Sequence, residues 1–152
     1  MPITANGLDE ILALAGKDLG HSDWLEITQE RVNQFAEATG DHQWIHVDVE
    51  RAKAGPFKGT IAHGYLTLSL VIPLFHQLLE ITGVSMGVNY GLEKVRFPSP
   101  VPVGSKIRLA GKVESVEPVA GNGAQMVVTF TVEIEGGGKP ACVATAVYRQ
   151  YA

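Results

Sequence analysis

Cysteine is almost absent from this sequence, with Cys142 as its single example. An intrachain disulfide is therefore excluded, which is typical of proteins from a reducing compartment. Basic runs are missing as well, and the net charge of −4 argues against nucleic acid as a partner. The N-terminal residues lack the positive charge and long apolar run of a signal peptide, so we expect a cytoplasmic location.

No apolar run is long enough to cross a bilayer. The most apolar stretch, Leu66–Phe75, is much shorter than the roughly 20 residues that a spanning helix needs, so no membrane partner is expected. Hydrophobic residues make up 45% of the 152 residues and charged residues 18%, which is typical of a soluble globular protein. No internal repeat or linker divides the chain, so we predict one domain over residues 1–152.

The N-terminal third alternates helical and extended patterns. The sequence predicts a short helix over Gly7–Ala15, a strand over Asp23–Thr28 and a second helix that begins after Thr28. Apolar or small residues recur on one face of this second helix, and Gly40 suits the left-handed position that closes it. Asp41 is therefore expected just past a helix end, at a rigidly supported point.

The middle of the chain pairs an irregular stretch with an apolar helix. Asp41–Thr60 contains glycine and proline, and a loop of this length in a compact protein is usually functional or disordered. Ile61–Ile81 is apolar nearly all round, which predicts a core helix, and Pro73 should kink it.

From residue 84 onward the hydrophobic period changes to two, which predicts strands. A slip in parity within the first of them indicates a β-bulge near Gly91–Lys94. Since one all-apolar helix needs a sheet to cover it, we predict an α+β fold in which an antiparallel sheet wraps around a long central helix. The strand regions are Val84–Phe97, Ile107–Val116, Met126–Ile134 and Ala141–Tyr151.

Acid–base residues are concentrated between Thr39 and Gly64, beside these rigid elements. Such a concentration is typical of an active site, because catalytic groups often lie on loops held by a scaffold. The ordinary structural roles are a turn aspartate after a glycine and hydrogen-bonded histidines in a packed loop. Imidazole and carboxylate groups also suit zinc or iron, although no H-E-x-x-H motif is present. The residues concerned are Asp41, His42, His46, Asp48 and His63.

Two segments, GDHQWIHVDVERA and IAHGYLTLSL, resemble motifs of the MaoC-like dehydratases. This hotdog-fold family includes the (R)-specific enoyl-CoA hydratases, also called hydratase 2. Gln43 and Trp44 stand where the family usually has Asn and Pro, which looks most like the nodulation-protein-N-like branch. The matching positions are Gly40, Asp41, His46, Ala52 and His63-Gly64, and the segment VRFPSPVPVG also looks like its family counterpart.

The resemblance implies a single hotdog domain that reversibly hydrates a trans-2-enoyl-CoA to the (R)-3-hydroxyacyl-CoA. Asp41 and His46 would hold one catalytic water, and the backbone N–H of Gly64 would stabilise the enolate oxygen. Gln43 and His63 are expected to contribute to substrate binding. The resemblance implies no metal and no cofactor beyond the CoA of the substrate, and it implies a homodimer that binds an acyl-CoA thioester.

Two other functions fit the same segments. A hotdog acyl-thioesterase commonly uses an acidic residue on the central helix, but Ala62–Leu79 holds no Asp or Glu and Glu80 comes too late. A non-catalytic subunit that only binds acyl thioesters is the other, and the presence of both Asp41 and His46 speaks against it. Ser69, Tyr65 and Asn89 are candidates for the pocket lining, and Cys142 is expected to be buried without chemistry.

Overall fold

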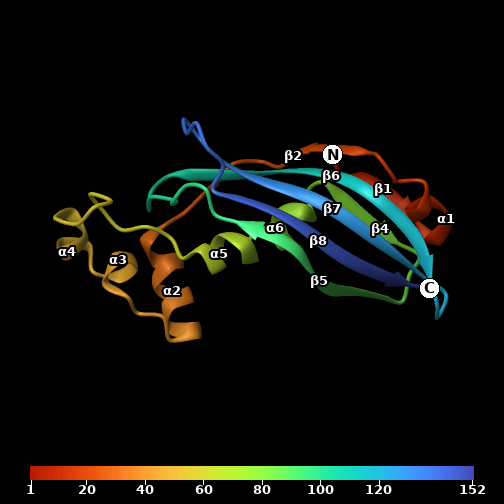
Figure 1. Cartoon of the computed structure of the whole chain (residues 1–152), viewed down its shortest axis with the longest axis horizontal. Helices are drawn as coiled ribbons and strands as arrows, with labels where there is room; N and C mark the ends of the chain where they lie inside the picture. Colours follow the sequence, from red (N-terminus) through yellow and green to blue (C-terminus); the bar gives the residue numbers. More distant parts are fainter.

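The computed structural model describes residues 1–152, and its main feature is a six-stranded antiparallel sheet (Figure 1). The strand order is β2-β6-β7-β8-β5, and the short β3 also pairs with β6. The predicted antiparallel sheet is therefore confirmed. The bounds are Asp18–His21 for β2, Leu25–Glu26 for β3, Met86–Arg96 for β5, Lys106–Val119 for β6, Gly123–Ile134 for β7 and Cys142–Tyr151 for β8.

The strict alternation of β7 places one set of its side chains on the core. Met126, Val128, Phe130 and Val132 are all buried, and the residues between them are half-exposed. This is the two-residue period that the sequence predicts for a sheet with one covered face. The turn before β7 places Asn122 in the left-handed region, with φ of 58°. The hairpin from β6 to β7 thus closes where the glycine-rich pattern indicates.

The central helix is shorter than the prediction of Ile61–Ile81, and it is broken. Helix α5 spans Gly64–Ser69, a turn at Leu70 follows, and α6 spans Val71–Phe75. Pro73 has no N–H to donate to the carbonyl of Ser69, so the helical hydrogen bonds are interrupted at this turn. The predicted Pro73 kink is therefore a break between two short helices.

The residues after α6 were predicted as helix and form a strand instead. Strand β4 (Leu79–Thr82) pairs in parallel with β1 (Ile3–Asn6), a strand that the sequence pattern did not reveal. Helix α1 (Gly7–Leu12) follows β1 and is shorter than the expected Gly7–Ala15. Four-residue strands are too short for a two-residue period to be recognised, which explains why β1, β2 and β4 escaped prediction.

Helix α2 (Gln29–Thr39) forms where the sequence predicts it. The Thr28 hydroxyl accepts a hydrogen bond from the Arg31 N–H at 3.1 Å, which satisfies one free donor of the first turn. At the other end Gly40 adopts φ of 82°, and its N–H bonds to the Ala36 carbonyl. Both ends of α2 are therefore fixed, and the chain leaves it in a defined direction.

The stretch Asp41–Thr60 is more regular than predicted, because it contains two short helices. These are α3 (Trp44–Val47) and α4 (Val49–Lys53), and the Asp48 carboxylate caps α4 by accepting from the Arg51 N–H. Helices α2, α3 and α4 gather beyond one end of the sheet, opposite α1 and both termini (Figure 1). No helix of the structure has the length and apolar character needed to cross a membrane.

Strand β5 forms an edge of the sheet, and none of its residues is buried. Its pairing with β8 shifts register between Asn89 and Gly91 and again between Leu92 and Lys94. The predicted bulge near Gly91–Lys94 is therefore confirmed, and it begins slightly earlier. Helix α6 packs on the sheet through Phe75, whose ring centroid lies 4.9 Å from that of Phe130.

Candidate active site

Asp41 follows the glycine that closes α2, so the fixed end of this helix sets its position. Its carboxylate is exposed, and Oδ1 accepts a hydrogen bond from the Gln43 N–H at 3.3 Å. Its backbone carbonyl accepts a hydrogen bond from Nε2 of His63 at 3.0 Å. One contact thus directs the Asp41 side chain and a second holds its backbone, and the other carboxylate oxygen is available.

His46 lies on α3 with only 6% of its surface exposed. Its Nδ1 donates to the Ile61 carbonyl at 2.7 Å, since a carbonyl oxygen can only accept. In the neutral ring Nε2 therefore carries the free lone pair. Burial lowers the pKa of His46 below 6.5, and the electrostatic effect of His63 lowers it further, against opposing contributions from Ile61 and Asp41. The ring therefore stays neutral and able to accept a proton at neutral pH.

His63 is 2% exposed and immediately precedes α5. Its Nε2 is the donor to Asp41, so Nδ1 carries the lone pair, and this buried nitrogen has no hydrogen-bond partner in the protein. The ring stacks on that of His46, with centroids 3.9 Å apart and planes 25° from parallel. His63 thus contacts both members of the predicted dyad.

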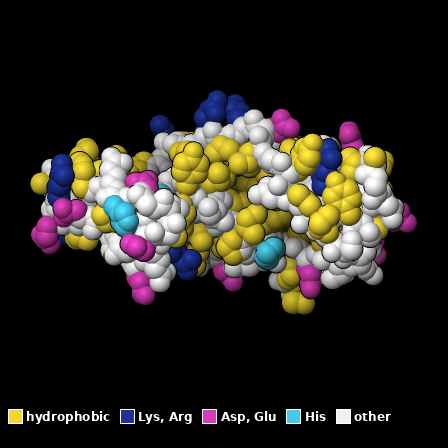
Figure 2. Space-filling model, turned by 90° about the horizontal axis from the view of Figure 1, so that it is seen from below, with side chains coloured by type: hydrophobic (Ala, Val, Ile, Leu, Met, Phe, Trp, Pro, Cys, Tyr) yellow, Lys and Arg dark blue, Asp and Glu magenta, His cyan; other side chains and the backbone are white.

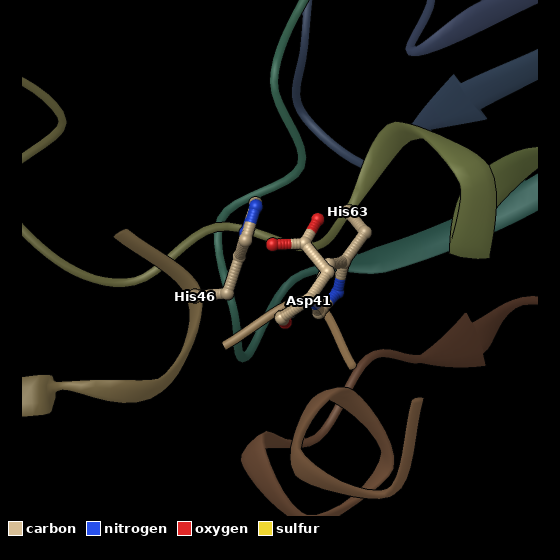
Figure 3. Close-up of side chains that lie close together, drawn as sticks. All are labelled: Asp41, His46 and His63. Carbon is tan, nitrogen blue, oxygen red and sulfur yellow. The ribbon is translucent and has the colours of Figure 1, made fainter. Parts of the chain in front are cut away.

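Asp41, His46 and His63 form a cluster in which one polar atom of each lies within 4.8 Å of the others. Figure 3 shows the Asp41 carboxylate beside the imidazole of His46, with His63 behind it. No direct hydrogen bond or ion pair joins the Asp41 carboxylate to His46. This spacing suits one water molecule that donates to both groups, because each such bond is about 2.7–3.0 Å long.

Of the five candidate metal ligands, only Asp41, His46 and His63 lie together. His42 faces Glu37 across 3.7 Å at the surface, and Asp48 caps α4. The remaining cluster includes two nearly parallel stacked rings. The nitrogen lone pair of an imidazole lies in the plane of its ring. Lone pairs on two stacked rings therefore point along nearly parallel planes and do not converge on one ion. The geometry favours a water-binding site over a metal centre.

A groove of about 310 Å³ opens beside the cluster and brings His46 and Gly64 to the same space. Gly64 is the first residue of α5, so its N–H has no partner within the helix. A β-carbon at this position would lie 3.4 Å from the Phe97 ring, so Phe97 borders the groove directly opposite Gly64. Other lining residues are Phe57, Thr67, Phe97, Pro100 and Ala141.

Several supporting residues were not found by sequence reasoning. Gln29 in α2 donates to the His46 carbonyl at 2.8 Å and accepts from the Thr60 hydroxyl at 2.6 Å. It thereby ties α3 to the chain before α5, yet in the sequence it is an ordinary first-turn residue. Phe57 and Phe97 line the groove, and nothing in the sequence around them indicates this position.

The other predicted lining residues have different positions. The Gln43 side chain is exposed at the start of α3, so its expected role in substrate binding stays a prediction. Ser69 lines a cavity of about 260 Å³ while its hydroxyl donates to the Tyr65 carbonyl within α5, and Tyr65 itself is 74% exposed. Asn89 lines the same cavity, which shares no residue with the groove beside His46.

Comparison with known proteins finds one family and two named relatives. The family described as MaoC like domain matches residues 10–135. The chain is 54% identical over 149 residues to "3-hydroxyacyl-thioester dehydratase Z" of Mycobacterium tuberculosis, covering 98% of this chain and 99% of the relative. It is 46% identical over 142 residues to "Nodulation protein N" of Rhizobium leguminosarum, covering 90% and 86%.

A solved structure agrees with this likeness. An (R)-hydratase from A. caviae superimposes with a TM-score of 0.71 at 25% identity, over 88% of this chain and 94% of that one. The predicted hotdog arrangement, in which an antiparallel sheet covers the central helical segment, is thereby confirmed.

Proposed function

Because this chain belongs to the MaoC-like domain family of dehydratases, we propose that it is an (R)-specific enoyl-CoA hydratase. The family and the relatives make it an enzyme of the hydratase and dehydratase class. The proposed reaction is reversible addition of water to a trans-2-enoyl-CoA, giving the (R)-3-hydroxyacyl-CoA. The observation that carries the proposal is the paired placement of Asp41 and His46 beside the groove that Gly64 opens onto.

In the proposed first step, two groups of the dyad accept hydrogen bonds from the catalytic water. Nε2 of His46 carries a lone pair and the Asp41 carboxylate is exposed, so a water held between them donates a hydrogen to each. As one of its O–H bonds breaks, the water oxygen bonds to Cβ, and the C=C electrons move toward the thioester carbonyl. The proton accepted by the dyad then passes to Cα, which restores the enzyme.

Negative charge builds on the thioester oxygen in this transition state, and a fixed donor must meet it. The backbone N–H of Gly64 fills this role in the proposal, since it opens the first turn of α5 in the groove that His46 also lines. No metal or redox cofactor is required, because the water is activated by the dyad and the charge is met by a peptide N–H.

The thioesterase alternative lacks its usual acid. Helices α5 and α6 hold no Asp or Glu, and Glu80 lies on β4, beyond both of them. A purely binding role would not require two histidines, each oriented by a backbone carbonyl, next to a free carboxylate. Hydration is therefore the function best supported by this set of groups.

An absorbance assay tests the proposal directly. Purified protein with crotonyl-CoA or a longer trans-2-enoyl-CoA should remove the absorbance of the conjugated thioester, and chiral analysis should give the (R)-3-hydroxyacyl product. Release of free CoA without hydration would favour the thioesterase. Binding without either reaction would favour the non-catalytic subunit.

A further inference from the structure

The side chain of Gln29 contacts two of the three segments that carry the site, and its own helix leads to the third. Its Nε2 donates to the backbone carbonyl of His46 at 2.8 Å, and its Oε1 accepts from the Thr60 hydroxyl at 2.6 Å. Helix α2 begins at Gln29 and closes at the glycine before Asp41, and the chain after Thr60 leads to Gly64. One amide therefore lies where the segments of the dyad and of the proposed oxyanion donor meet.

The partners of this amide fix its orientation. A backbone carbonyl can only accept, so the amide nitrogen must face His46, and the oxygen is left for the hydroxyl of Thr60. The second hydrogen on Nε2 is donated to Oδ1 of Asn33, one turn further along α2, at 2.9 Å. Gln29 is half-buried and Thr60 is 8% exposed, so the bonds to His46 and Thr60 are partly shielded from water. The Gln29 side chain is thus held in one arrangement.

These contacts close a ring that includes the imidazole of His46. Its Nδ1 donates to the Ile61 carbonyl at 2.7 Å, and the Ile61 N–H donates to the Ile45 carbonyl at 3.0 Å. Because Ile61 directly follows Thr60, Gln29 supplies a further tie between α3 and the residue beside this carbonyl. The bond from Nδ1 selects the tautomer that leaves the lone pair on Nε2. That selection therefore depends on the position that the amide gives to Thr60.

Helix α2 has little apolar packing that could replace this tie. Only Val32 and Ala36 of its residues are buried, and the larger Phe35 is half-buried. The helical end of the molecule, on the left of Figure 2, carries charged and other polar side chains, whereas hydrophobic side chains gather over the middle. Loss of the hydrogen bonds of Gln29 should therefore be felt in the spacing between α3 and the chain before α5.

We propose that Gln29 is a positioning residue for the dyad. Through the His46 carbonyl and the Thr60 hydroxyl, it keeps the His46 imidazole in the tautomer whose Nε2 accepts a hydrogen from the catalytic water. The inference rests on the proposed hydration. Gln29 does not line the groove beside His46, so its loss should lower kcat and leave KM nearly unchanged.

The first test removes the hydrogen bonds of this link one side at a time. Gln29→Met keeps the length of the side chain without its amide, and Thr60→Val replaces the hydroxyl with a methyl group. Each should lower the kcat for crotonyl-CoA about tenfold, the effect of losing one good hydrogen bond. The double variant should be no worse than Gln29→Met alone, because both changes break the same link.

Two further variants separate this role from general destabilisation. Thr60→Ser restores the hydroxyl and should recover most of the kcat that Thr60→Val loses. Gln34→Met is the matched control, because Gln34 is exposed on the same helix, and it should keep the wild-type kcat. If melting curves show that Gln29→Met does not fold, the comparison of Thr60→Val with Thr60→Ser decides the question.

The second test observes His46 without the reaction. Nitrogen NMR of protein with isotope-labelled histidine distinguishes the two neutral tautomers, and the signal of His46 is the one absent from His46→Gln. At neutral pH, wild type and Gln34→Met should carry the proton on Nδ1, whereas Gln29→Met should show a mixture with the Nε2-protonated form. A wild-type kcat in folded Gln29→Met, a raised KM at unchanged kcat, or an unchanged tautomer would overturn the assignment. If wild type hydrates no thioester, the proposed function fails, and the tautomer of His46 still decides the role of Gln29.

Discussion

The imidazole of His46 stacks on that of His63, with ring centroids 3.9 Å apart, while His63 donates to the backbone of Asp41. One buried residue therefore holds both members of the proposed dyad in place. The charge that His63 would carry if protonated also lowers the pKa of His46, in addition to the larger effect of burial. The position and the basicity of the dyad thus depend on the same neighbour.

The pH profile of His63→Phe tests this dependence. Neutral His46 accepts a proton and the protonated form does not, so activity should be lost as the pH falls through the pKa of His46, below 6.5. Phenylalanine keeps the stacked ring and removes the electrostatic effect by which His63 lowers the pKa of His46, so the acid limb of kcat/KM should move to higher pH. The kcat should fall about tenfold, because the Asp41 carbonyl loses its donor. A variant with an unchanged limb would show that His63 only fills space.

Loss of either dyad member should remove an essential proton transfer. Asp41→Asn and His46→Gln are each expected to lower kcat by at least about 10²-fold, with a smaller change in KM. The double variant should be scarcely worse than either single one, because groups that act as a unit are not additive. Gln43→Ala serves as the control and should cost less, since only its backbone contacts Asp41.

Melting curves are needed alongside these rates. Asp41 is exposed and asparagine is nearly isosteric with it, so Asp41→Asn should unfold at close to the wild-type temperature. Near-normal hydration by a folded Asp41→Asn protein would falsify the dyad.

Removal of metal ions should leave the activity unchanged. The stacked rings of His46 and His63 direct their lone pairs side by side, which does not suit a shared ion. Incubation with a chelator followed by the absorbance assay measures this, and elemental analysis of the untreated protein is the control. Activity that disappears with the chelator and returns with zinc would instead establish a metal centre at Asp41, His46 and His63.

The thiol of Cys142 should be unreactive in the folded protein. It is 1% exposed at the start of β8, and burial raises its pKa to about 11, so hardly any thiolate forms at neutral pH. A thiol reagent should react with the denatured protein and not with the native one. Cys142→Ala should keep hydration within a few-fold of wild type, and a loss as large as that of a dyad variant would mean that the site is misplaced.

The protein should be a homodimer. Strand β5 has a neighbour on one side only, and Met86, Tyr90 and Leu92 on it are exposed. Pairing of this edge with a second copy would satisfy its free backbone groups and cover these side chains. Light scattering at micromolar concentration should return twice the 16.3 kDa of one chain. A mass equal to one chain would contradict the prediction.

The sequence was most informative where a single local rule decides the structure. Thr28 and Gly40 mark the ends of α2, and the alternation around Phe130 marks β7, because a cap or a two-residue period depends only on neighbours in the chain. Asp41, His46 and His63 also stood out, since acid–base residues are concentrated in this short stretch and match the family motif. The structure brings these three together.

The remaining features depend on partners that are distant in sequence. Leu79–Thr82 is apolar enough to continue a helix, and it becomes a strand because β1 pairs with it. The support that Gln29 gives to His46, and the placement of Tyr148 opposite Asn89, are likewise long-range contacts. No periodicity within one segment encodes such contacts, so they could not be predicted.

The parallel pairing of β1 with β4 also has a consequence for biosynthesis. Ile3 pairs with Leu79, so the first strand to leave the ribosome must wait for the next 76 residues before its partner exists. At roughly 5–20 residues per second, the nascent N-terminus spends about 4–15 s unpaired. During that interval α2 can already form from its own caps, whereas Ala5 and Ile11, fully buried in the finished protein, are open to chaperones. The order of synthesis therefore makes the helical end of the molecule the first part able to fold, and the N-terminal strand one of the later ones.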